Sequence, residues 1–117
     1  MKAKIYHNPR CSKSRQALEL LEHHGVQIEE IRYLDTPPSK AQLKALLQAL
    51  DLSAQHILRF TEARAKQLGL SRDDKRTQAQ WLELLSQNPE LIERPIIVVG
   101  NKAVVGRPPE NVLQLLN

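Results

Sequence analysis

The sequence predicts an α/β fold with a mixed β-sheet and a helical insert, in the order β-α-β, insert, β-β-α. Residues 3–34 show a strand, a helix and a second strand, and residues 95–116 show a β-hairpin and a helix. Between them, residues 37–92 carry apolar side chains at helical spacing. A chain of 117 residues is long enough to bury a core of its own, so we expect one domain over residues 1–117.

The N-terminal part predicts a βαβ unit. Residues 3–7 (AKIYH) and 28–34 (IEEIRYL) have the composition of short strands. The stretch from Cys11 to His24 has helical periodicity and is followed by Gly25, a common helix stop. A helix that crosses between two strands implies that the strands pair in parallel.

Capping motifs indicate helices within the insert. In a capping box, a Ser or Thr and the Gln three positions later bond reciprocally to the backbone at the helix start. Residues 60–76 are polar and charged, and they predict no definite element. The capping boxes are Ser39 with Gln42 and Thr77 with Gln80, and a short helix is expected from Ser53 to about Arg59.

A β-hairpin and a last helix are predicted at the C-terminal end. The stretch PIIVV (95–99) is β-branched and apolar, Gly100-Asn101 is a two-residue hairpin signal, and KAVVG (102–106) returns. The prolines of Pro108-Pro109-Glu110 are typical of a helix start.

The hairpin register carries a functional hint. If Val99 pairs with Lys102, the same register places Arg94 opposite Arg107. Like charges directly opposed on a sheet are destabilising, and an anion bound between two guanidiniums would explain them. Solvated arginines beyond the strand ends are the alternative, and the register alone leaves both interpretations open.

Cys11 is the only cysteine, and it stands at the predicted start of the first helix. A helix N-terminus and nearby arginines, here Arg10 and Arg15, favour the reactive thiolate. Ser14 could donate a hydrogen bond to the sulfur. A buried structural cysteine is the alternative, but the polar surroundings fit burial poorly and favour a nucleophile. One cysteine also excludes an intramolecular disulfide.

Topology connects these features. If the hairpin pairs antiparallel with the first strand, its open end lies beside the end of that strand. Arg94, Arg107 and the N-terminus of the helix would then surround Cys11. This combination predicts an oxyanion site.

Composition narrows the possible partners. Seventeen basic and thirteen acidic side chains give a formal net charge of +4, which suits an anionic partner. Aromatic residues are only 3% of the chain and no basic stripe is present, so nucleic-acid binding is not expected. No apolar run is long enough to span a membrane and the N-terminus lacks a secretory signal, so we expect a cytoplasmic protein.

Four stretches carry a resemblance to a known family: IYHNPRCSKSR with Cys11, HILR ending in Arg59, ERPIIVV with Arg94, and VGRPPE with Arg107. Together they resemble the ArsC family of arsenate reductases, the glutaredoxin-coupled class on a thioredoxin-like (glutaredoxin-like) fold. The resemblance covers nearly the whole chain and is to the short members. It implies that Cys11 is the catalytic nucleophile and that the three arginines hold the oxyanion.

The same resemblance assigns supporting roles. His7, Asn8, Ser14 and Arg15 match the nucleophile loop of the family and are expected to tune the thiolate. Pro95 matches the position at which thioredoxin-like folds carry a cis-proline.

The resemblance also implies a mechanism. The Cys11 thiolate attacks arsenate, glutathione adds to the arsenic, glutaredoxin reduces the adduct, and arsenite is released. Glutathione is then a co-substrate, no cofactor or metal is expected to be bound, and the chain is expected to act as a monomer.

Two other functions stay open. Spx-type proteins share the fold and bind RNA polymerase, several of them using a CxxC redox switch. Here that stretch is Cys11-Ser12-Lys13-Ser14, which has no second thiol. A glutathione-linked thiol reductase with a substrate other than arsenate is the other alternative.

Overall fold

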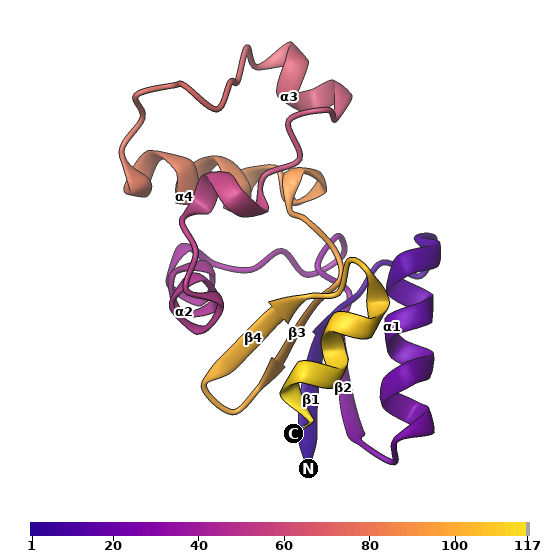
Figure 1. Ribbon diagram of the computed structural model, residues 1–117. Helices are drawn as coiled ribbons and strands as arrows, with labels where there is room; N and C mark the ends of the chain where they lie inside the picture. Colours follow the sequence, from indigo (N-terminus) through magenta and orange to yellow (C-terminus); the bar gives the residue numbers. More distant parts are fainter. Residues whose placement is uncertain (117) are drawn as a thin grey trace. The chain divides into compact units, whose positions relative to one another are not determined.

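The computed structural model describes residues 1–116, which form two compact units (Figure 1). The first, here called the sheet unit, comprises Met1–Thr36 and the chain from Arg94 onward. The second, the insert unit, is Pro37–Glu93, close to the range predicted for the helical insert. That the whole chain behaves as one domain stays a prediction.

The sheet unit contains a four-stranded mixed sheet in the order β2-β1-β3-β4. Strand β1 (Lys2–Tyr6) pairs in parallel with β2 (Gln27–Ile31) and antiparallel with β3 (Ile96–Val99). Strand β3 then forms a hairpin with β4 (Lys102–Val105). The predicted β-α-β and β-β-α pattern is confirmed, including the antiparallel contact between the hairpin and β1.

The hairpin has the predicted register, since Val99 pairs with Lys102. The pairing extends one residue beyond β3 and β4, where the Gly106 amide donates to the Pro95 carbonyl at 2.8 Å. Arg94 and Arg107 come next in this register, and each precedes a proline joined by a cis peptide bond. The cis bond at Pro95 was expected.

The core of the sheet unit lies on one face of the sheet. It is covered by α1 (Ser12–His23) and by a 3-10 helix, η3 (Pro109–Leu115). Because side chains alternate along a strand, the odd-numbered positions of β1 face this core. The buried cluster consists of Ala3, Ile5, Ala17, Leu21, Ile97 and Val112.

Two elements differ from the prediction, one in extent and one in helix type. The second strand was predicted over residues 28–34 but ends at Ile31, because Arg32 starts a turn in which its carbonyl accepts from the Thr36 amide at 2.9 Å. The last helix is present but is wound as a 3-10 helix, a form common in short helices.

The insert unit is helical. Both capping boxes are present, at Ser39 before α2 (Lys40–Leu50) and at Thr77 before α4 (Gln78–Gln87). The short helix expected after Ser53 is the 3-10 helix η1 (Ala54–Ile57). Two further short helices had no prediction, α3 (Ala63–Gln67) and the 3-10 helix η2 (Pro89–Leu91).

Candidate functional site

The loop between β1 and α1 places Cys11 at the N-cap of α1. Its backbone is extended, with φ −93° and ψ 122°, and its carbonyl accepts the first helical bond from the Arg15 amide at 3.0 Å. The Cys11 amide in turn donates to the Asn8 carbonyl at 3.0 Å. The thiol is half-buried and free. The cysteine therefore lies where the unpaired amides of a helix start are available to an anion.

The surroundings of Cys11 favour its thiolate. Burial by itself raises the pKa of the thiol, but this is outweighed by the Ser14 backbone N–H, the charge of Arg94, the Lys13 backbone N–H and a hydrogen bond from the Arg94 side chain. The net result is a Cys11 pKa below the ordinary value of a cysteine. A larger fraction of the sulfur is therefore ionised near neutral pH, and the thiolate is the nucleophilic form.

Ser14 uses its side chain and its backbone for different purposes. Its hydroxyl lies 2.6 Å from His7 Nδ1 and accepts a hydrogen bond from the Asn8 amide at 3.1 Å. Its backbone N–H is one of the groups that stabilise the Cys11 sulfur. Ser14 thus links the sulfur to the residues that precede the turn.

His7 is buried, with 3% of its side chain exposed. Burial lowers its pKa most; Glu30 raises it, and Arg32 and Arg15 lower it, so the net pKa is below the ordinary value of a histidine. His7 is therefore neutral near neutral pH and holds one proton on one ring nitrogen.

Asn8 and Arg15 hold the shape of the loop. The Asn8 side-chain oxygen accepts from the Arg10 amide at 3.0 Å. The Arg15 guanidinium donates to the Pro9 carbonyl at 2.8 Å. These bonds order a loop that has no regular secondary structure.

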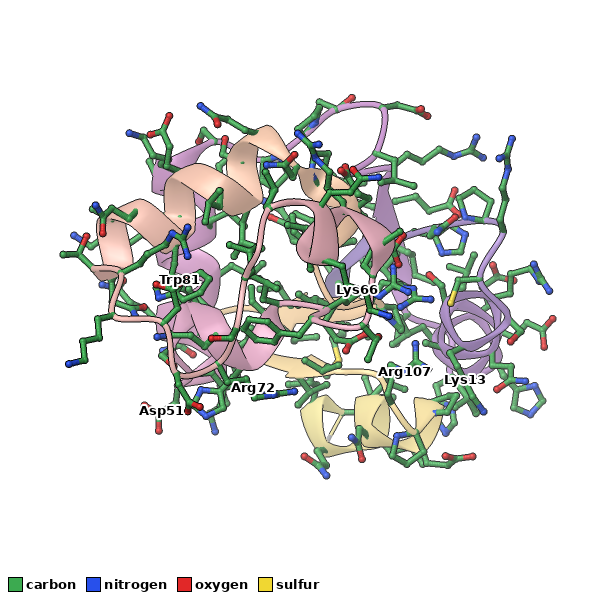
Figure 2. All side chains as sticks on the ribbon, turned by 90° about the horizontal axis from the view of Figure 1, so that it is seen from above. Lys13, Asp51, Lys66, Arg72, Trp81 and Arg107 are labelled. Carbon is green, nitrogen blue, oxygen red and sulfur yellow. The ribbon has the colours of Figure 1, made fainter. Side chains whose placement is uncertain are left out.

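Arg94 and Arg107 flank the ends of the hairpin. The Arg94 guanidinium contacts the Cys11 thiol, so the structure brings together the predicted nucleophile and one predicted anion-binding residue. Arg107 is exposed, and its carbonyl accepts from the Asn111 side chain at 3.2 Å. Figure 2 shows Lys13 at the start of α1 and Arg107 where the chain runs from β4 to the last helix.

Arg59 belongs to the insert unit. Its guanidinium forms an ion pair with Glu62 at 3.1 Å and donates to the Glu90 carbonyl at 3.3 Å. Its backbone amide donates to the Leu91 carbonyl at 2.7 Å. These contacts order Arg59 within its own unit, and its convergence with Cys11 stays a prediction.

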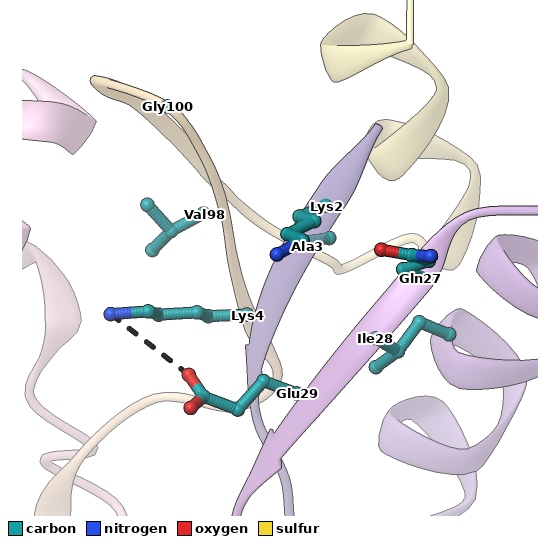
Figure 3. Close-up of a pocket in the computed structure, with 8 residues that line it drawn as sticks. All are labelled: Lys2, Ala3, Lys4, Gln27, Ile28, Glu29, Val98 and Gly100. Carbon is teal, nitrogen blue, oxygen red and sulfur yellow. Dashed lines mark ion pairs between the residues drawn. The ribbon is translucent and has the colours of Figure 1, made fainter.

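A hollow of about 590 Å³ lies on the sheet, lined by the first three residues of β1 and of β2 together with Val98 and Gly100 (Figure 3). Lys4 and Glu29 form an ion pair across it at 3.9 Å. None of the predicted site residues that the structure describes lines it. Within residues 1–116 no cluster of His, Cys, Asp and Glu is arranged to hold a metal ion, and no helix is long and apolar enough to cross a membrane.

One residue near the site was not predicted from the sequence. Glu30 of β2 places its carboxylate 3.7 Å from His7 Nε2. The parallel register pairs Ile5 with Glu30, and the alternation of side chains then puts Glu30 on the same face as His7. The order of β1 and β2 would have indicated this neighbour once the register was known.

Comparison with known proteins identifies the family of this chain. The family model described as "ArsC family" matches residues 6–115. The chain belongs to the ArsC family.

Curated relatives and solved structures agree with this membership. The chain is 46% identical over 114 residues to a protein of Neisseria meningitidis named "Arsenate reductase", covering 97% of each chain. It is 39% identical to an Escherichia coli protein of the same name, covering 96% of this chain and 79% of that one. The solved structure titled "Arsenate reductase from Vibrio cholerae" matches with a TM-score of 0.93 at 43% identity, over 97% of each chain. The fold of this ArsC protein is thioredoxin-like, as expected.

Proposed function

We propose that this ArsC protein is an arsenate reductase that uses glutathione and glutaredoxin as reductants. The observation that carries the proposal is the Cys11 thiol at the N-terminus of α1, with a lowered pKa and the Arg94 guanidinium beside it. A thiolate next to a fixed cation is suited to attack an oxyanion, because the cation offsets the charge of the incoming oxygens. Relatives named arsenate reductase support the choice of anion.

The proposed reaction proceeds through a sulfur–arsenic bond. The Cys11 thiolate attacks the arsenic of arsenate, and one arsenate oxygen leaves as water. The thiol of glutathione displaces a second oxygen, again as water. A glutaredoxin thiolate then attacks the glutathione sulfur and forms a mixed disulfide with it. The bond between that sulfur and the arsenic breaks, and its electron pair remains on the arsenic. Hydrolysis releases arsenite and regenerates Cys11. In sum, arsenate and two thiols give arsenite, one disulfide and water.

The sequence requires an external thiol for the reducing step. Cys11 is the only cysteine of the chain, so no second protein sulfur can resolve the adduct. Ser14 occupies the position where a CxxC motif would have its second cysteine, and its hydroxyl is bonded to the His7 ring and the Asn8 amide. This external requirement is the reason for proposing glutathione and glutaredoxin as partners, and the cytoplasm, where both are abundant, as the location.

The arginines are proposed to act at different stages. Arg94 stabilises the thiolate before substrate binds and the arsenate oxygens afterwards. Arg107 and Arg59 are proposed to complete the oxyanion site, with His7, Asn8, Ser14 and Arg15 holding the nucleophile loop. The protein is proposed to do this as a monomer with no bound cofactor.

The test is a coupled assay in which NADPH oxidation by glutathione reductase reports arsenate-dependent disulfide formation. The wild-type protein is compared with Cys11→Ser, in the presence of glutathione and glutaredoxin. We expect turnover with arsenate for the wild type only, and loss of activity when either thiol component is omitted. Turnover by Cys11→Ser at the wild-type rate would refute the proposal. Activity of the wild type on a mixed disulfide but not on arsenate would instead support a glutathione-linked thiol reductase.

A further inference from the structure

The side chains of Glu30, His7 and Ser14 form a chain of contacts from β2, an edge strand of the sheet, to α1. Glu30 of β2 has its carboxylate 3.7 Å from His7 Nε2, and His7 Nδ1 lies 2.6 Å from the Ser14 hydroxyl. His7 and Ser14 are buried, whereas the Glu30 side chain is 41% exposed. The backbone holds this arrangement, because the His7 amide donates to the Ile31 carbonyl at 2.8 Å.

The position of Glu30 decides which ring nitrogen of His7 holds the proton. A carboxylate facing Nε2 attracts an N–H there and repels a lone pair. With the proton on Nε2, Nδ1 has a lone pair and accepts the proton of the Ser14 hydroxyl. The oxygen of that hydroxyl then remains an acceptor for the Asn8 amide, as observed at 3.1 Å.

In this arrangement the Ser14 hydroxyl both donates and accepts a hydrogen bond. Its single proton is donated to His7 and its oxygen accepts from the Asn8 amide, so the hydroxyl has no proton left to donate to the Cys11 sulfur. The Ser14 backbone N–H, in the first turn of α1, is the largest of the contributions that stabilise the Cys11 thiolate. Fixing the Ser14 side chain therefore fixes a donor to the nucleophile.

We propose that Glu30 is a positioning residue of the nucleophile loop, which acts through the His7 proton and the Ser14 hydroxyl to keep the Ser14 amide on the Cys11 sulfur. Glu30 lies outside HNPRCSKSR and has no role in the function proposed above. The inference rests on that function only in that both concern Cys11, and its tests use neither arsenate nor glutaredoxin.

The charged groups that face His7 are Glu30 and Arg32 from the β2 side and Arg15 from α1. Of these, only Glu30 favours a proton on the ring. Replacing Glu30 by Gln removes this preference, and the Gln side chain can donate to Nε2 as readily as it accepts from it. The ring proton is then free to move to Nδ1. There the N–H would donate to the Ser14 oxygen, and the Ser14 hydroxyl would no longer donate to His7.

The first test is nitrogen-15 NMR of the imidazole of His7. We expect the wild-type ring to be protonated on Nε2 only, and Glu30→Gln to show a substantial share of the Nδ1-protonated form. Glu29→Gln is the matched control, because Glu29 neighbours Glu30 in β2 but pairs with Lys4, and it should keep the wild-type tautomer. An Nδ1-protonated ring in the wild type, or an unchanged ring in Glu30→Gln, would overturn the inference.

The second test follows the consequence at Cys11 by the pH dependence of its alkylation by iodoacetamide. Removing a negative charge would by itself lower the pKa of the thiol, whereas loss of positioning raises it. We expect Glu30→Gln to raise it, so that alkylation well below the pKa slows about three- to ten-fold, a rise of up to about one pKa unit. Ser14→Ala should slow alkylation similarly, and Glu29→Gln should not. An unchanged or lowered Cys11 pKa in Glu30→Gln would contradict the positioning role.

Discussion

The two units differ in how they hold the arginines of the predicted site. In the sheet unit, Arg94 directs its guanidinium at the Cys11 thiol and lowers its pKa. In the insert unit, Arg59 pairs with the carboxylate of Glu62 and donates to the Glu90 carbonyl. The charge of Arg94 thus acts on the Cys11 thiol, whereas the charge of Arg59 is balanced by a neighbouring carboxylate.

This difference separates two properties of the protein. The lowered pKa of the Cys11 thiol depends on groups of the sheet unit: the backbone N–H groups of Ser14 and Lys13 and the guanidinium of Arg94. The insert unit contains Arg59, which is proposed to bind substrate and is not among the groups that set the pKa of the thiol. Changes in the sheet unit should therefore alter Cys11, and changes in the insert unit should alter stability or arsenate use.

The largest effect is expected from Arg94→Ala. Hydrogen bonds to charged groups contribute about 1.5–3 kcal/mol, so we expect kcat/KM for arsenate to fall roughly ten- to hundred-fold, with a higher Cys11 pKa. Arg94→Lys keeps the charge but loses the planar fork, and it should restore the pKa more than kcat/KM. Alkylation rates against pH and the coupled assay measure the two quantities. An Arg94→Ala protein with the wild-type Cys11 pKa would contradict the statement that Arg94 acts on the thiol.

A smaller effect is expected from Arg59→Ala, and it should differ from that of Arg107→Ala. Arg59 loses an ion pair and a hydrogen bond within its unit, which we expect to lower the free energy of unfolding by about 1 kcal/mol. Arg107 is exposed, and exposed interactions contribute little to stability, so Arg107→Ala should lower stability less than Arg59→Ala does and raise KM for arsenate.

Urea unfolding and the KM for arsenate measure these outcomes. The alkylation profile of Cys11 should be unchanged in Arg59→Ala. If Arg59→Ala raises the Cys11 pKa as much as Arg94→Ala does, the proposed division between the two units is wrong.

The narrowest effect is expected from Thr77→Ala, which removes the N-cap of α4 and should change stability alone. The Thr77 hydroxyl accepts from the Gln80 amide at 3.2 Å, and loss of such a cap costs about 1 kcal/mol of stability. Urea unfolding measures the change, with the exposed Thr36→Ala as control. We expect no change in Cys11 alkylation, and a slower reaction would show that the insert helices influence the thiolate.

The sequence allowed much of the sheet unit to be predicted, because its signals are local. Gly100-Asn101 specifies a two-residue turn, and the turn specifies the register up to Arg94 and Arg107. The capping boxes at Ser39 and Thr77 located two helices of the insert for the same reason.

What the sequence did not predict depends on contacts between distant residues. The short helix α3 has few residues with which to form a pattern, and it is held by burial of Ala65 and by a hydrogen bond from Arg64 to Asn88 at 3.0 Å. The proximity of Glu30 to His7 requires the register of β1 against β2. Arg59 was selected only through the family resemblance, since nothing in its local sequence distinguishes it from a solvated arginine.

The most direct test of the central claim is a pH titration of the Cys11 thiolate by its ultraviolet absorbance, with Cys11→Ser as the blank. Because the folded protein lowers the pKa of this thiol, the thiolate should form, and reactivity should rise, at a lower pH than in an unperturbed cysteine. We predict a single inflection below the ordinary value for a cysteine. An inflection at or above that value would contradict this prediction.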